Sequence, residues 1–116
     1  MSSIGIDIIE VKIFRRLLAY SKQRAWRSYF FNSELQYCFN KSNPEIHLAV
    51  KFAAKEAIIK AFAGQGITLQ FNQIEIYSDF KLPQARIYQV GLTAADILIS
   101  LSHSAQVGVA VAFVSL

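Results

Sequence analysis

Residues 43–66, "NPEIHLAVKFAAKEAIIKAFAGQG", decide the fold, because they predict one long helix with a recognisable start and end. Asn43 is a favoured N-cap residue, and Pro44 suits the first helical position because its missing N–H has no helical partner there. Gly64 suits the stop, where glycine is enriched. We therefore expect a helix of roughly 20 residues, and the rest of the chain must pack around it.

Three charged residues interrupt the small and apolar run near the end of this helix: Lys55, Glu56 and Lys60. An ordinary explanation is a surface pair between Glu56 and Lys60, which are four residues apart, worth about 0.2–0.5 kcal/mol. Asp7 is a second isolated charge, inside the alternating segment "GIDIIE" at 5–10, although aspartate is depleted from strands. Asp7 is either an edge residue that reaches solvent or a functional carboxylate.

The segments around the helix predict a single α+β domain over residues 1–116. A strand is expected at 3–10, a basic helix from 11 to about 20, and a short helix opened by a capping box of Ser33 and Gln36. Further strands are expected at 73–78, 85–90, 97–102 and 107–114. The last carries no charge, so we predict a central strand covered on both faces. The long helix is expected to pack on this mainly antiparallel sheet.

The composition is apolar for so short a chain, with 53% hydrophobic and 17% charged residues. This balance favours apolar surface that a partner or self-association covers. No apolar run approaches the ~20 residues that span a bilayer, so no membrane span is expected. Cys38 is the only cysteine, which excludes an internal disulfide and fits a reducing compartment. We therefore expect a cytoplasmic protein.

Half of the 12 basic residues lie between positions 12 and 27, and no acid occurs from 11 to 33. On a helix, Lys12, Arg15 and Arg16 share one face, opposite an apolar face. This basic face is either solvated or binds an acidic partner. The aromatic residues are not interleaved with the basic ones and no RNA-binding motif occurs, so we expect no nucleic-acid partner.

Four segments occur in an order that resembles a known family: "GIDIIE", "FAAKEAIIKAFAGQG", "FNQIEIYSD" and "ISLSHSAQVGVAVAFV". They resemble holo-[acyl-carrier-protein] synthases, the short members of the 4′-phosphopantetheinyl transferase superfamily, over nearly the whole chain. The lysine–glutamate–alanine motif with an upstream aspartate at this distance is specific to that family. The resemblance implies transfer of 4′-phosphopantetheine from coenzyme A to a serine of an acyl carrier protein, with release of 3′,5′-ADP.

The resemblance also implies roles for the isolated charges. Asp7 and Glu56 would bind Mg²⁺, which prefers hard oxygen ligands and usually takes only one or two carboxylates. Glu56, Lys60 and His103 would be the catalytic residues, with Lys60 stabilising the leaving 3′,5′-ADP. Taken alone, a histidine at the end of a strand, as in "SLSHS" at 100–104, is more often structural than catalytic.

The remaining implied contacts concern coenzyme A, the carrier and assembly. The residues expected to bind coenzyme A are Lys51, Lys55, Lys60, Gly64, Gln65 and Gly66. The residues expected to dock the acidic acyl carrier protein are Lys12, Arg15, Arg16 and Arg24. The resemblance also implies a homotrimer whose active sites lie between neighbouring protomers.

The sequence departs from the family pattern in three places. Ile13 and Lys51 stand where arginine is usual, and residues 81–96 form a shortened segment. Two alternatives therefore stay open beside an active transferase. One is a diverged paralogue with a specialised carrier or little activity. The other is a basic binding module without catalysis, although such a module has no need for Asp7 in a strand.

Overall fold

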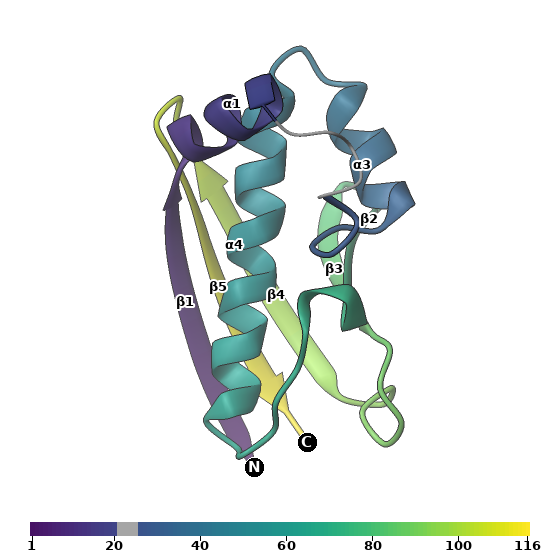
Figure 1. Cartoon of the computed structure of the whole chain (residues 1–116). Helices are drawn as coiled ribbons and strands as arrows, with labels where there is room; N and C mark the ends of the chain where they lie inside the picture. The colour runs from purple at the N-terminus through teal and green to yellow at the C-terminus, as the bar shows by residue number, and fades with distance from the viewer. Residues whose placement is uncertain (21–25) are drawn as a thin grey trace.

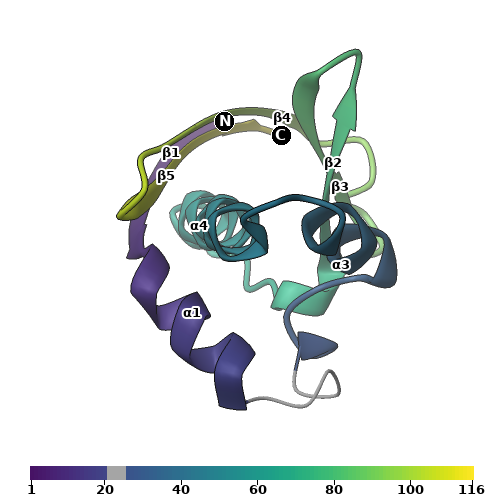
Figure 2. The same cartoon turned by 90° about the horizontal axis from the view of Figure 1, so that it is seen from above.

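The computed structural model describes residues 1–20 and 26–116, and the long helix α4 (Pro44–Ala63) is its central element. Figure 1 shows α4 lying along a three-stranded sheet, and Figure 2 shows the sheet curving around the helix. The predicted bounds of this helix are confirmed, with Asn43 at the N-cap, Pro44 in the first turn and Gly64 at the C-cap. The α+β prediction, a long helix packed on a mainly antiparallel sheet, is also confirmed.

The sheet has the order β1-β5-β4, formed by β1 (Ser2–Glu10), β5 (Val107–Ser115) and β4 (Asp96–His103). Both pairings are antiparallel, and the register sets Asp7 opposite Ala110 and Ala110 opposite Leu101. The inward residues of β5 are small where α4 crosses them, and they meet alanines of the helix. Small side chains on both sides let the helix backbone approach the sheet closely.

The other face of the sheet is apolar and open in this single chain. Its exposed hydrophobic side chains are Ile4, Ile6 and Ile8 of β1, Leu98 of β4 and Phe113 of β5. The order β1-β5-β4 confirms the central position predicted for the strand at 107–114. Its predicted coverage on both faces is not found within one chain, because α4 covers only one face. We call this exposed set the outer sheet face.

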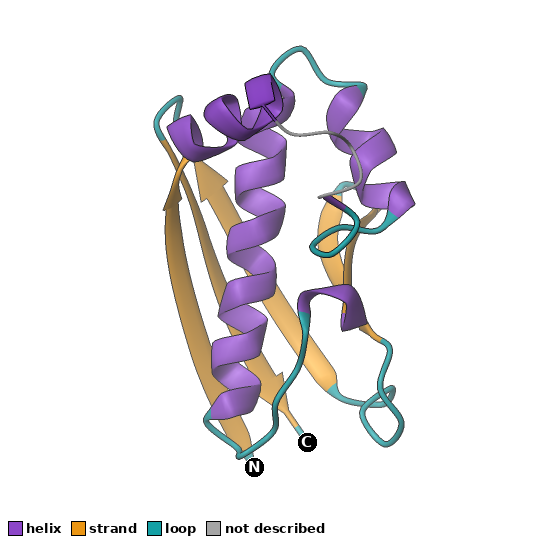
Figure 3. Ribbon diagram, in the orientation of Figure 1, coloured by secondary structure: helices purple, strands orange, loops and turns teal. Residues whose placement is uncertain are grey.

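Two shorter helices, α1 (Val11–Tyr20) and α3 (Asn32–Phe39), flank α4 on either side (Figures 2 and 3). The capping box predicted at Ser33 is wrong. Phe31 takes the N-cap position, and its backbone N–H donates to Glu34 Oε1 at 2.7 Å. The hydroxyl of Ser33 instead donates to Glu75 Oε2 at 2.6 Å. A tertiary partner has displaced the local one.

A hairpin of β2 (Ile74–Asp79) and β3 (Leu82–Ile87) follows a short 3₁₀ turn, η1 (Phe71–Gln73), and packs beside α3. The strand predicted at 85–90 begins earlier than expected, because Leu82 already pairs with Asp79 across the turn. Within the described ranges, no helix is both long enough and apolar enough to cross a membrane.

Candidate functional site

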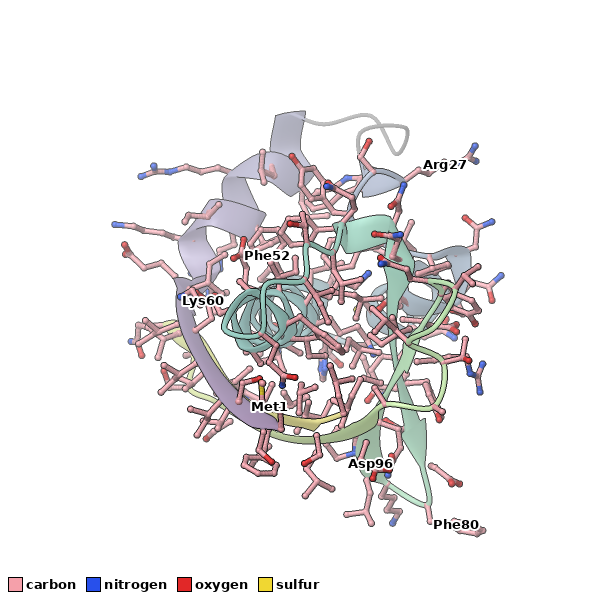
Figure 4. All side chains as sticks on the ribbon, turned by 90° about the horizontal axis from the view of Figure 1, so that it is seen from below. Met1, Arg27, Phe52, Lys60, Phe80 and Asp96 are labelled. Atoms are coloured by element: carbon pink, nitrogen blue, oxygen red, sulfur yellow. The ribbon has the colours of Figure 1, made fainter. Side chains whose placement is uncertain are left out.

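Asp7, Glu56 and Lys60 come together between β1 and α4. The alternation of β1 turns Asp7 toward the helix with Gly5 and Ile9, and away from the outer sheet face. Lys60 Nζ donates to Asp7 Oδ1 at 3.2 Å and to the carbonyl oxygen of Ile6 at 3.0 Å. Figure 4 shows Lys60 on the side of α4 that faces β1. Lys60 therefore pairs with Asp7 from the neighbouring strand, and the simple surface pair with Glu56 does not describe its contacts.

The electrostatics show that Asp7 and Glu56 lie close enough to repel each other. The pKa of Glu56 is raised, first by burial and second by the negative charge of Asp7, while Lys60 opposes the shift. Two carboxylates that share one positive neighbour form a donor set of hard oxygens. That set fits Mg²⁺, since this ion is commonly held by one or two carboxylates with water and substrate phosphate in its other positions.

The described residues hold no group of three or more aspartate, glutamate, histidine or cysteine side chains that would form a complete metal site. A site made only of Asp7 and Glu56 leaves most coordination positions to water and substrate. That is typical of magnesium sites that bind a phosphate group together with the ion.

Lys55 does not join this group, although it precedes Glu56. Its side chain is fully buried, and its ammonium donates to Glu34 Oε1 and to the carbonyl oxygen of Tyr29, both at 2.6 Å. Burial lowers the pKa of Lys55, and the charge of Glu34 opposes that shift. This burial does not favour the predicted contact between Lys55 and a phosphate, because the charge of Lys55 is paired with Glu34 inside the protein.

Lys51 and His103 lie on the other side of α4, where they line one small cavity of about 70 Å³ beside β4 and the β2–β3 hairpin. Lys51 is almost buried, and its ammonium donates to the carbonyl oxygen of Ile76 at 3.1 Å. The ring of His103 lies 6.2 Å, centre to centre, from that of His47. Burial lowers the pKa of His47, and the nearby Lys41, His103 and Lys51 lower it further.

His47 lies beside the predicted site residues Lys51 and His103, and the sequence did not single it out. It lies four residues before Lys51, so both project from the same side of α4. That spacing was the available signal, but nothing in the sequence indicated that His103, from a distant strand, would reach the same place. The resulting cluster of Lys41, His47, Lys51 and His103 contains two lysine side chains and no carboxylate, which suits an anionic ligand.

One chain therefore carries two separate groups of candidate residues. Asp7 belongs to β1 and His103 to β4, and these strands are the opposite edges of the sheet. Glu56 and Lys60 face the β1 edge, whereas Lys51 faces the hairpin and β4. The structure unites Asp7, Glu56 and Lys60, as predicted, but it does not bring His103 to them within one chain.

The predicted coenzyme A turn, residues 64–66, leads out of α4 just beyond Lys60. Gln65 Nε2 donates to Ser3 Oγ at 2.6 Å, which ties the turn to the start of β1. Gly66 has a φ of 77°, a left-handed conformation that glycine adopts without a steric cost. The backbone of the turn is thus held at the end of the helix that carries Glu56 and Lys60.

The basic face of α1 is partly paired within the chain. Lys12 Nζ lies 3.0 Å from Glu10 Oε2, and Arg15 Nε lies 3.6 Å from Glu45 Oε1. Both basic side chains remain more than half exposed. Arg24, predicted to dock the carrier with them, lies outside the described residues.

An apolar pocket of about 250 Å³ lies beside this basic face, and sequence reasoning did not predict it. Its lining comes from β1, α1, the segment after residue 25, and α4: Ile9, Ile13, Phe14, Leu17, Trp26, Tyr29, Phe30 and Phe52. Ile13, which replaces the usual arginine, is one of these residues. Ile9 follows Asp7 by two residues and Phe52 precedes Glu56 by one turn, so the pocket adjoins the carboxylates.

Comparisons with known proteins show the family of the chain. The family model of the 4′-phosphopantetheinyl transferase superfamily matches residues 3–114. A holo-[acyl-carrier-protein] synthase of Chlamydia trachomatis is 39% identical over 116 residues, covering 97% of this chain and 98% of the relative. The corresponding protein of Chlamydia muridarum is 40% identical, covering 97% and 93%.

Solved structures give the same answer. The holo-[acyl-carrier-protein] synthase of Helicobacter pylori, solved in complex with coenzyme A, has a TM-score of 0.82 and 29% identity, covering 97% of this chain and 99% of that one. The acyl carrier protein synthase of Mycobacterium tuberculosis has a TM-score of 0.76 and 27% identity, covering 97% and 96%. The chain therefore belongs to the 4′-phosphopantetheinyl transferase superfamily, and it is a phosphopantetheinyl transferase of the holo-[acyl-carrier-protein] synthase type.

Proposed function

We propose that this protein transfers 4′-phosphopantetheine from coenzyme A to a serine of an acyl carrier protein and releases 3′,5′-ADP in a magnesium-dependent reaction. The observation that carries the proposal is the convergence of Asp7, Glu56 and Lys60 from two elements far apart in sequence. The Helicobacter pylori relative binds coenzyme A. Two carboxylates and a lysine are the groups that a pyrophosphate substrate with a divalent cation requires.

Each residue has a distinct part in this reaction. Asp7 and Glu56 would hold the Mg²⁺, which when bound neutralises charge on the pyrophosphate oxygens. Lys60 pairs with Asp7 but its side chain is more than half exposed, so its ammonium is also accessible to the phosphate of the leaving 3′,5′-ADP.

The direct test is the mass of the carrier protein after incubation with coenzyme A, Mg²⁺ and this protein. The wild type should add the mass of the phosphopantetheine arm, whereas Asp7→Ala and Glu56→Ala should abolish nearly all transfer while the fold is kept. Glu10→Ala is the matched control, since Glu10 is an exposed carboxylate on the same strand. A wild type that leaves the carrier unchanged, or an Asp7→Ala variant with full activity, would contradict the proposal.

We also propose a homotrimer with coenzyme A bound between protomers. Two observations support it: the two groups of candidate residues lie on opposite edges of one sheet, and the outer sheet face exposes five large apolar side chains. In a closed ring, a head-to-tail contact would bring the His103 edge of one protomer against the Asp7 edge of the next. The same contact would cover the outer sheet face.

The acyl carrier protein should dock on α1 and the adjoining apolar pocket. Acyl carrier proteins are acidic, so Lys12, Arg15 and Arg16 offer them complementary charge. The pocket offers burial for an apolar side chain next to Asp7 and Glu56, where the acceptor serine must arrive. With Ile13 in the pocket lining, this chain has apolar contact where its family usually has an arginine. We expect the reaction to take place in the cytoplasm, in keeping with the free thiol of Cys38.

A further inference from the structure

A fully buried ion pair lies directly behind the wall of the apolar pocket. Neither Lys55 nor Glu34 has an exposed side chain, and Lys55 Nζ lies 2.6 Å from Glu34 Oε1. Charges at such depth are retained only when their polar atoms are satisfied. All of the partners are found within the described chain, so the pair is complete without any ligand.

The pair and its partners together belong to five different segments. Lys55 on α4 donates to the carbonyl oxygens of Tyr29 and Phe71, at 2.6 and 3.4 Å. Glu34 on α3 accepts the N–H of Phe31 at 2.7 Å and that of Ile76, on β2, at 2.8 Å. One ion pair thus fixes α4, α3, the residues before α3, η1 and β2 to one another.

Two of these segments contribute the aromatic wall of the apolar pocket: α4 through Phe52, and the residues before α3. Tyr29 and Phe30 line the pocket, and the ammonium of Lys55 lies 5.2 Å from the centre of the Phe30 ring. Tyr29 also packs against Phe52 and Phe71, at 5.9 and 5.2 Å between ring centres. These rings form one layer, and Lys55 holds two of its members by their backbone carbonyl oxygens.

We propose that Lys55 is a positioning residue for carrier recognition: together with Glu34 it holds Tyr29 and Phe30 in place as the wall of the apolar pocket, and it makes no contact with coenzyme A. This inference rests on the proposed function, because the pocket is the place where the carrier docks. It assigns different roles to the two adjacent residues of the motif. Glu56 faces the reacting groups, and Lys55 faces inward and supports the carrier site.

The two possible roles of Lys55 affect different substrates. A phosphate contact would lower the affinity for coenzyme A and for 3′,5′-ADP when removed, and Glu34 would have no part in it. A positioning role would raise the KM for the carrier, leave the binding of 3′,5′-ADP unchanged, and depend on Glu34 as much as on Lys55. Loss of folding alone would impair transfer to the carrier and the binding of coenzyme A and of 3′,5′-ADP together.

The experiment therefore compares the wild type with Lys55→Met, Glu34→Gln and the double variant. Wild-type transfer to the carrier is measured first, and its failure would refute the proposed function itself. Each variant is then characterised by its unfolding transition, by KM and kcat for the carrier and for coenzyme A, and by calorimetric titration with 3′,5′-ADP. Lys55→Arg keeps a positive charge and N–H groups that can donate to Glu34. This variant therefore tests whether transfer to the carrier depends on the ion pair.

We expect each single variant to raise the KM for the carrier by roughly five- to thirty-fold, the effect of losing one or two kcal/mol of docking free energy. The double variant should be little worse than either single one, because both lose the same interaction. Lys55→Arg should recover part of the loss, and 3′,5′-ADP should bind every folded variant as it binds the wild type. Weaker binding of 3′,5′-ADP to Lys55→Met, or an unchanged carrier KM in Glu34→Gln, would overturn the inference.

Discussion

Adding one methyl group at Gly5 should separate the two elements that carry the proposed catalytic residues. A Cβ at this position would overlap the carbonyl oxygen of Ala57 and lie 2.9 Å from the Ala57 carbonyl carbon and from the Ala61 backbone nitrogen. These are backbone atoms of α4, which cannot rotate away as a side chain can. Carbon atoms normally approach to about 3.5–4.0 Å, so β1 and α4 must move apart by roughly 1 Å.

The expected cost has two parts. Overpacking of this kind destabilises a fold by about 1–3 kcal/mol. The displacement also moves Asp7, two residues along β1, away from Glu56 and Lys60 on α4. A misplacement of about 1 Å in catalytic geometry lowers a rate by roughly 100-fold. Gly5→Ala should therefore keep enough stability to fold and lose nearly all phosphopantetheinyl transfer.

The assay combines denaturant unfolding with transfer measured over a range of Mg²⁺ concentrations. Gly108→Ala is the matched control, because its Cβ would meet α4 at the milder distances of 3.1–3.3 Å, against the backbone of Ala49 and Val50 and not against the turns next to Glu56 and Lys60. It should cost less stability and leave the Mg²⁺ dependence of transfer close to that of the wild type. Full activity in Gly5→Ala would refute the reasoning, as would an equal loss of activity in both variants.

Three further predictions concern charge and assembly. The pKa of Glu56 should lie above its ordinary value in an NMR titration and fall in Asp7→Asn, though only in part, because burial is the largest cause. Since that pKa is raised in the folded state, the contribution of Glu56 to folding stability should fall as the pH rises through the pKa. The affinity for Mg²⁺ should instead weaken as the pH falls through the same pKa, because the ion competes with the proton for the carboxylate. The double variant Arg15→Glu with Arg16→Glu should raise the KM for the carrier at low salt and flatten the salt dependence of that KM. The reason is that exposed charges are screened over about 8 Å at physiological ionic strength. An unchanged KM would mean that the basic face of α1 is only solvated. Ile6→Glu should dissociate the proposed trimer in light scattering, whereas Val90→Glu, in an exposed loop, should not. A wild type that is monomeric when active would refute the assembly.

The features that could be predicted from sequence are those set by local geometry. Asn43, Pro44 and Gly64 mark the ends of α4 because capping depends on the few residues around each helix end. The alternation of β1 likewise separates Asp7 from the outer sheet face, since successive side chains of a strand point to opposite sides. That Asp7 would meet Glu56 and Lys60 followed from the family resemblance, because no local pattern connects residues so far apart.

Predictions failed where a tertiary contact or an unusual turn overrides the local pattern. The turn between β2 and β3 places Phe80 and Lys81 at φ values of 48° and 66°, a conformation that glycine or asparagine usually marks. Without that mark in the sequence, the start of β3 was placed three residues too late. Ser33 resembles a helix cap by its spacing from Gln36, but its hydroxyl reaches Glu75 across the fold.

The two residues of the Lys55–Glu56 motif show why a specific motif does not assign each of its members. Consecutive residues of an α-helix project about 100° apart, so neighbours in a motif face different surroundings. Here one direction leads to Asp7 at the surface, and the other leads to Glu34 in the interior. The motif marks the position of the helix, and only the packing of α3 against α4 decides which of its two charges remains available to a substrate.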